Sequence, residues 1–185
     1  MAQLFGDEEF ATPFPYKTTV RGEQYGPEDT YLLAAKWLRD CKTVADWGGG
    51  RGYFQKCLTA EQAYLLIDGT KQVPQTRVAD LAKYRGKSEG ILLRHVLEMT
   101  FDWKDVLANA VAAFQKRMVV VTYTPNVKKT HRAKWHLTSP VFHFNHEADL
   151  VPLMEPYLVK IEPIQAWPTL PERVYYLTKE GGERG

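Results

Sequence analysis

The sequence predicts an α/β fold in a single domain, with a mostly parallel β-sheet sandwiched between helices. Three observations support this prediction. Several apolar runs, such as AYLLID and MVVV, are unbroken, as in strands covered on both faces. Segments with helical spacing separate these runs. The 185 residues contain no internal repeat and no linker that would divide them, so one sizeable core is expected.

The first part of the chain predicts a helix followed by a strand, a helix and a strand. Residues 27–40 begin with proline and acidic residues and end with basic ones, which is typical of a helix. Residues 42–47 are a short strand that ends at a run of glycines. A helix is expected over 51–62, and the apolar run at 63–68 predicts a second strand.

The alternation continues as far as residue 125. A short third strand is expected over 76–80 and a buried fourth strand over 90–96. Residues 103–116 have apolar side chains at helical spacing, and the fifth strand follows at 117–125. Helices between consecutive strands indicate parallel pairing.

Beyond Pro125 the pattern is less regular. The segment at 127–136 is basic and irregular, and a short helix with Asn145 as its cap is expected over 146–156. Extended segments are expected at 141–144, 157–165 and 173–179.

The two ends of the chain differ from the body at 27–179. Residues 1–26 are rich in turn formers and aromatic residues and are expected to form an arm or lid, and residues 180–185 a disordered tail. No stretch resembles a secretory signal or a membrane span, so a cytoplasmic protein without a membrane partner is expected. Cys41 and Cys57 are expected to be reduced thiols.

The glycines at 48, 50 and 52 lie between a predicted strand and a predicted helix. Such a turn allows positive φ, close approach of a ligand and free backbone N–H groups. Asp46, Asp68 and Asp80 each lie at the end of a predicted strand, on the edge where open parallel sheets bind ligands. Asp68 follows Gly48 by twenty positions, which suits a carboxylate that binds ribose hydroxyls. A nucleoside ligand is indicated; the alternative is an ordinary tight turn.

The spacing GxGxG, with tyrosine at position 53, does not fit the dinucleotide pattern GxGxxG. Instead, ADWGGGRG resembles motif I of the class I S-adenosylmethionine-dependent methyltransferases. LLIDGT is similar to the ribose-binding segment of that family, VADL to its adenine segment, and LLRHVLEM to the HVLE segment after its fourth strand. The resemblance covers residues 28–125 and implies a Rossmann-like fold.

The resemblance also implies a methyltransferase with S-adenosylmethionine as cofactor. Asp46 and the backbone at Gly48, Gly50 and Gly52 would hold the methionine part, Asp68 the ribose, and Asp80 with Leu81 the adenine. Two residues depart from the family pattern. Met99 stands where many members have a second histidine, and Trp47 is bulkier than the usual residue between acid and glycine.

His95 is the candidate general base, because imidazole has a pKa in the right range and the residue follows the fourth strand. The alternative is a structural histidine. Glu98 is a second catalytic candidate, which would orient His95 or contact the substrate; the alternative is a solvated carboxylate.

Tyr16, Tyr123 and Trp135 are candidates for lining an acceptor pocket, although such aromatic residues also serve to anchor an arm. The net charge of +2 and the absence of NPPY or DPPY disfavour nucleic-acid bases as acceptors. His131, His136, His143 and His146 have no metal-site spacing, so no metal is expected.

We therefore expect methyl transfer to oxygen or nitrogen of a small molecule, such as a sugar or another metabolite. Two alternatives stay open. One is a module that binds S-adenosylmethionine without turnover. The other is a methyltransferase acting on RNA or protein, suggested by the basic residues that surround Trp135.

Overall fold

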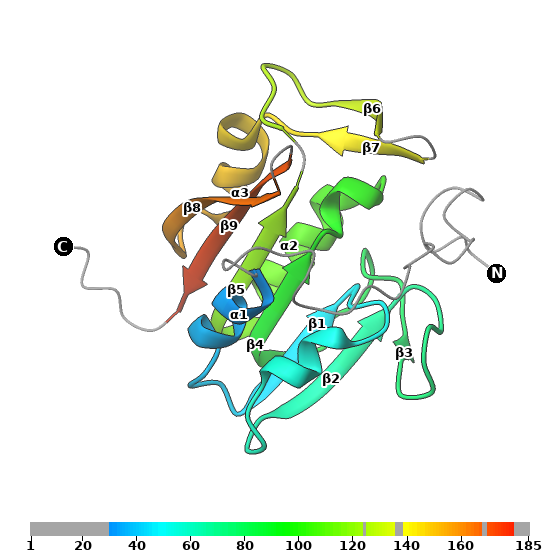
Figure 1. Ribbon diagram of the computed structural model, residues 1–185, viewed down its shortest axis with the longest axis vertical. Helices are drawn as coiled ribbons and strands as arrows, with labels where there is room; N and C mark the ends of the chain where they lie inside the picture. Colours follow the sequence, from blue (N-terminus) through cyan, green and yellow to red (C-terminus); the bar gives the residue numbers. More distant parts are fainter. Residues whose placement is uncertain (1–29, 124, 136–138, 168–169, 180–185) are drawn as a thin grey trace.

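A seven-stranded sheet in the order β3-β2-β1-β4-β5-β9-β8 forms the centre of the molecule (Figure 1). The computed structural model describes residues 30–123, 125–135, 139–167 and 170–179. Neighbouring strands from β3 to β5 pair in parallel, whereas β9 is antiparallel to both β5 and β8. The predicted α/β fold with a mostly parallel sheet is confirmed.

The helices and strands follow one another in the order that the sequence predicts, with an additional hairpin. The elements of the first half are α1 (Thr30–Trp37), β1 (Thr43–Trp47), the 3₁₀ helix η2 (Tyr53–Cys57), β2 (Ala63–Asp68), β3 (Arg77–Val78), β4 (Ser88–Arg94) and the 3₁₀ helix η3 (Leu97–Met99). The remaining elements are α2 (Trp103–Ala113), β5 (Phe114–Thr122), β6 (His131–Trp135), β7 (Ser139–His143), the π-helix η4 (His146–Leu150), α3 (Val151–Met154), β8 (Leu158–Trp167) and β9 (Leu170–Thr178).

Strand β1 lies between β2 and β4, and this position creates a switch point in the strand order. The chain goes outward from β1 to β2 and β3, and then returns to pair β4 with the other side of β1. In parallel sheets the connections on either side of such a switch point diverge and leave a crevice at the carboxyl ends of the strands. The segments that follow β1 and β4 therefore meet at this edge.

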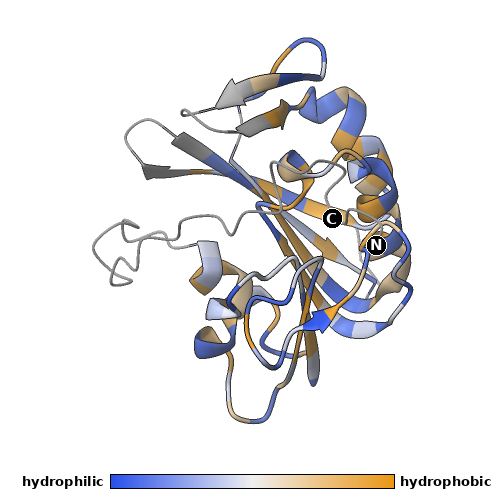
Figure 2. Cartoon of the chain, turned by 90° about the vertical axis from the view of Figure 1, so that its right-hand side faces the viewer, coloured by the Kyte–Doolittle hydropathy of each residue, from blue (hydrophilic) through white to orange (hydrophobic). Residues whose placement is uncertain are grey.

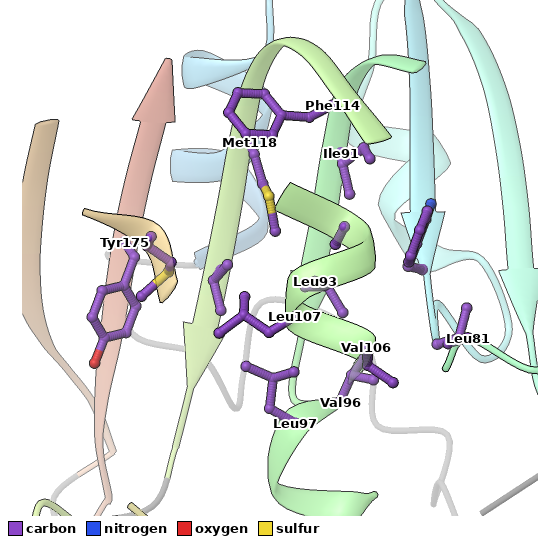
Figure 3. Close-up of a cluster of buried hydrophobic side chains, with 14 of the residues drawn as sticks. Leu81, Ile91, Leu93, Val96, Leu97, Val106, Leu107, Phe114, Met118 and Tyr175 are labelled. Atoms are coloured by element: carbon purple, nitrogen blue, oxygen red, sulfur yellow. The ribbon is translucent and has the colours of Figure 1, made fainter. Parts of the chain in front are cut away.

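Alternate residues of the strands form two separate cores. Ile91 and Leu93 of β4 pack into the core beneath α2 and α3, whereas Leu92 faces the core beneath α1 and η2. Figure 2 shows apolar residues along the central strands and both apolar and hydrophilic residues on the flanking helices. In Figure 3, Val106 and Leu107 of α2 are directed toward the sheet beside Leu93. The sheet is thus covered on both faces, as predicted.

The helix predicted over 51–62 is wrong for most of its length, because only the 3₁₀ turn η2 forms. Leu58 is extended, with φ −85° and ψ 159°, and so ends the turn. The Gln62 side chain donates hydrogen bonds to the carbonyls of Leu38 and Cys41, which holds the chain close to the end of α1. Phe54 is fully buried and stacks on Tyr31, which fixes the short turn against α1.

The segment after β5 is more regular than the sequence suggests. Residues 131–135, predicted to be irregular, pair with 139–143 as an antiparallel hairpin beyond the carboxyl ends of the parallel strands (Figure 1). Phe142 of this hairpin packs edge-on against Phe101, with ring centroids 6.1 Å apart. The predicted cap is confirmed, since the Asn145 side chain accepts a hydrogen bond from the Ala148 N–H at 3.0 Å.

The predicted arm over 1–26 and the tail over 180–185 lie outside the described residues, so these boundaries stay predictions. Among the described helices, none has the length and apolar character needed to cross a membrane.

Candidate active site

The loop after β1 uses glycine where the protein's own atoms leave no room for a side chain. Gly48, Gly50 and Gly52 have φ values of +74°, +55° and +70°, a region that favours glycine. A Cβ atom at Gly48 would lie 2.4 Å from Val96 Cγ2, and one at Gly49 would lie 2.3 Å from Asp46 Oδ2. Packing of the loop itself therefore requires glycine at 48 and 49, whereas at 50 and 52 the positive φ is what mainly favours it.

Asp46 lies beneath the loop and is 2% exposed. Its Oδ2 accepts a hydrogen bond of 2.7 Å from the Tyr64 hydroxyl. Burial raises the pKa of Asp46 to about 7, although Tyr64 and Arg94 act in the opposite direction. The carboxyl group thus supports the loop from below.

Asp68 joins the end of β2 to the glycine loop. Its Oδ2 accepts a hydrogen bond of 2.9 Å from the Gly50 N–H, and its Oδ1 accepts one of 2.9 Å from the Thr70 N–H. Oδ1 also accepts a hydrogen bond of 3.3 Å from the Thr70 hydroxyl, so the acceptor capacity that is left for a ligand is on Oδ2. Asp68, the predicted ribose-binding residue, therefore lies directly beside the glycine loop.

Asp80 and Leu81 line a small hollow beside Asp68. Its other walls are Gly69, Ala82, Val96, Thr100 and Val106, and its free space holds about one water molecule. The Asp80 carboxylate accepts a hydrogen bond of 3.0 Å from the Ala82 N–H and shapes the turn after β3. The predicted adenine residues are thus next to the predicted ribose residue, across from the segment that follows β4.

His95 lies at the end of β4 and has φ +58°, which is rare for a residue other than glycine. Its Nε2 is 2.9 Å from Glu172 Oε1, within hydrogen-bonding distance although the ring N–H is not aligned on that oxygen. The same Oε1 lies 3.3 Å from Arg94 Nη2. Burial, together with the Arg94 charge, lowers the pKa of His95, whereas Glu172 acts to raise it. Burial and the Arg94 charge thus favour the neutral form of the His95 imidazole.

Glu98 is fully buried, so the interpretation of this residue as a solvated carboxylate is wrong. Its Oε1 accepts a hydrogen bond of 2.6 Å from the Tyr123 N–H. Burial raises the pKa of Glu98 to about 8, and a carboxyl group with that pKa is mostly protonated at pH 7. Its position favours a role in holding the chain after β5.

Tyr123, a predicted acceptor-pocket residue, lies against His95. The two rings meet edge to face with centroids 4.8 Å apart. The Tyr123 hydroxyl donates to the Met99 sulfur at 3.2 Å, so Met99 supports the tyrosine at the position where many related proteins have a histidine. Contacts with His95 and Met99 thus fix the position of the Tyr123 ring.

For the other predicted site residues the structure gives no contact with this group. Tyr16 lies outside the described residues, and Trp135 belongs to β6 in the outer hairpin. In that hairpin the rings of His131 and His143 lie 5.5 Å apart, whereas His146 is buried against Tyr175. In the part of the chain that the structure describes, no three metal-ligating side chains gather as an ion would require.

Sequence reasoning missed Glu172 and Tyr64. Glu172 is 78 positions after Arg94, in a strand with no motif, and no local signal identifies it. Tyr64 lies within the buried run AYLLID, where its polar end is the one weak signal for a contact with a neighbouring acid.

Comparisons with known proteins support the fold. No family model matches the chain, and no curated protein resembles it in sequence. Among solved structures, the chain is similar to 1,6-didemethyltoxoflavin-N1-methyltransferase of Burkholderia thailandensis with bound S-adenosylhomocysteine: TM-score 0.58, identity 15%, over 82% of this chain and 80% of that one. It is also similar to magnesium protoporphyrin IX methyltransferase of Synechocystis: TM-score 0.61, identity 13%, over 80% and 81%. The chain therefore has the Rossmann-like fold of S-adenosylmethionine-dependent methyltransferases.

The same fold also occurs in the [4+2]-cyclase SpnF, which matches with a TM-score of 0.64 and 9% identity, over 83% of this chain and 81% of that one. A shared fold thus accommodates a different reaction, so the reaction has to be argued from the site.

We predict that Gly48→Ala lowers the free energy of unfolding by about 2 to 4 kcal/mol, because it adds steric overlap with Val96 to the strain of positive φ. Gly52→Ala is the matched control. Its φ is similar at +70°, but its Cβ would meet Leu66 Cδ2 at 3.1 Å, a much milder contact. It should cost only about 1 to 2 kcal/mol. Chemical denaturation measures both; equal losses would mean that Val96 does not restrict the loop.

We also predict that Glu98→Gln flattens the pH dependence of stability. The folded-state pKa of Glu98, about 8, exceeds the ordinary value of 4.5, so the folded chain binds the extra proton between these values. The contribution of Glu98 is therefore complete below about pH 4.5 and is lost as the pH rises to 8, by up to about 1.4 kcal/mol per pH unit. Glutamine cannot titrate. Denaturation at pH 5 and pH 8 tests this, with the exposed Glu155→Gln as control; an unchanged slope would contradict the protonated state.

Proposed function

We propose that this chain is an S-adenosylmethionine-dependent methyltransferase that transfers a methyl group to oxygen or nitrogen of a small-molecule acceptor. The observation that carries the proposal is the hydrogen bond from the Gly50 N–H to Asp68, with the Asp80–Leu81 hollow immediately beside it. A carboxylate and a partly apolar hollow beside it are two parts that an adenosyl group needs.

The residues of the edge fit such a cofactor. Asp68 would accept hydrogen bonds from the ribose hydroxyls through its remaining lone pairs, and Leu81 and Val96 would pack on either side of adenine. The loop at 48–52 would face the methionine part, supported from beneath by Asp46. When bound, S-adenosylmethionine supplies a methyl group that its sulfonium has already activated.

The protein then has to place an acceptor in line, keep water out and receive a proton. Placement alone contributes roughly 7 to 11 kcal/mol. The neutral form of His95 is favoured and its side chain is 23% exposed, so its imidazole could accept a proton from an acceptor hydroxyl or amine. The ring of Tyr123 beside it would form an apolar wall for that acceptor.

Cofactor binding requires the hollow to open, because its space for about one water molecule is far smaller than adenine. The turn after β3 is joined to α2 by the Asn109 side chain, whose Nδ2 donates hydrogen bonds to the carbonyls of Leu81 and Ala82 at 3.1 and 2.6 Å, so opening has to preserve or break these contacts.

A small acceptor is favoured over RNA by the state of the basic residues. The Arg132 guanidinium stacks 3.8 Å above the ring of Phe101, so it is engaged within the protein. Lys128 and Lys129 are exposed, as charged residues on a solvated surface usually are.

Isothermal titration calorimetry tests the cofactor. We expect heat on mixing with S-adenosylmethionine and S-adenosylhomocysteine and none with NAD. Asp68→Asn should weaken binding by about 1.5 to 3 kcal/mol, because it removes the charge that receives the hydrogen bonds. Asp102→Asn, at an exposed position before α2, is the matched control and should bind as the wild type does.

Two results would overturn the proposal. Binding of NAD in preference to the adenosyl ligands would assign the loop to another cofactor class. An absence of heat with both adenosyl ligands at millimolar concentration would show that the hollow does not open for them.

A further inference from the structure

Arg94 and His95 both contact the buried carboxylate of Glu172, which lies far from them in the sequence. Glu172 of β9 is 3% exposed, and its Oε1 contacts both Arg94 and His95, at 3.3 and 2.9 Å. Strand β9 lies next to β5, which in turn pairs with β4, so the carboxylate reaches across β5 to the end of β4 (Figure 1). The contact is therefore a product of the fold and not of local sequence.

The backbone at His95 makes this meeting possible. Successive residues of an extended strand point to opposite faces, so Arg94 and His95 could not both contact one carboxylate if β4 continued straight. The left-handed conformation at His95, with φ +58°, brings both side chains to the same acid. Such a conformation costs roughly 1 to 2 kcal/mol, and strain of this kind is concentrated at functional sites.

Arg94 fixes the carboxylate and keeps it charged. Its Nε donates a hydrogen bond of 2.9 Å to Thr30 Oγ1, and its guanidinium lies 4.2 Å above the ring of Tyr31. Burial alone would raise the pKa of Glu172, but His95 and Arg94 lower it to about 2. Glu172 is thus a fixed anion beside Nε2 of His95.

The surroundings of His95 leave its second ring nitrogen for another partner. Arg94 faces it from β4, Glu172 from β9 and Tyr123 from the end of β5, while Glu98 of η3 is engaged with the Tyr123 N–H. Among the described residues, Glu172 is the one side chain that meets a ring nitrogen of His95 at hydrogen-bonding distance. Catalytic hydrogen bonds are often misaligned before the substrate binds and tighten afterwards.

We propose that Glu172 is a positioning residue for His95. Its carboxylate accepts a hydrogen bond from the Nε2–H group of His95. This contact fixes the imidazole tautomer and directs the unprotonated Nδ1 toward the acceptor. This inference rests on the proposed methyltransferase function. As the acceptor oxygen or nitrogen bonds to the methyl carbon, the carbon–sulfur bond breaks and its electron pair stays on sulfur. The acceptor proton goes to Nδ1, and Glu172 stabilises the imidazolium until the proton passes to water.

The first test uses the wild-type protein without cofactor or substitution. Nitrogen-15 NMR of the imidazole rings distinguishes the two neutral tautomers, and His95→Gln assigns the signal. We expect the His95 proton on Nε2. A proton on Nδ1 would overturn the proposal, because Nδ1 could then not act as the base.

The second test compares Glu172→Gln with Glu162→Gln. Glu162 on β8 is a matched control, since it also pairs with a cation, Lys160, at 2.9 Å. Glu172→Gln should mix the His95 tautomers and lower the pKa of His95, because the anion that raises it is lost. The control should change neither. An unchanged tautomer and pKa in folded Glu172→Gln would mean that the contact is purely structural.

Kinetics with a confirmed acceptor give an independent measure. Glu172→Gln should lower kcat by about 10- to 100-fold, with cofactor affinity retained. The acidic limb of the rate profile should move to lower pH, because the base would stay neutral down to lower pH. If the substitution only unfolded part of the protein, the rate would fall at every pH and the acidic limb of the rate profile would stay at the same pH. Failure of the proposed function would instead appear as absent cofactor binding in the wild type, whatever the tautomer of His95.

Discussion

The parallel pairing of β1 with both β2 and β4 is the constraint on which the rest of the site depends. It places the ends of three strands on one edge and forces the loop after β1 to turn between them. The Gly48 N–H donates to the Ile67 carbonyl at 2.7 Å, which continues the β1–β2 ladder one residue into the loop. Gly50 then bonds to Asp68, so β2 holds the loop twice, while Val96 after β4 limits it from the other side.

This tight packing changes how the glycine pattern should be interpreted. Val96, Asp46, Tyr64 and Leu66 occupy the space that side chains would need at 48, 49 and 52, so the fold requires these glycines before any ligand binds. The neighbouring hollow is lined by none of these glycines, so their conformation is set by the packing of the loop and not by the shape of the hollow.

The sequence predicts the parts of the site that are continuous along the chain. The apolar runs identify the strands, and the glycines and strand-end acids identify the edge where Asp68, Asp80 and Leu81 meet. Prediction from the sequence fails where burial, or a contact between residues far apart in the chain, determines the structure. A polar pattern could not reveal that Glu98 is buried beneath Tyr123, or that η2 would end at Leu58. Glu172 could not be found at all, because its role arises only when β9 pairs with β5.

In the proposed function the two halves of the sheet would have different tasks. Asp46, Asp68 and Asp80 belong to the β1–β3 half, where short segments of sequence place polar groups at one edge. His95 and Glu172 belong to the β4–β9 half and come together only through the fold. The same fold occurs in methyltransferases and in a cyclase, so the side chains at this edge, and not the fold, have to decide the reaction.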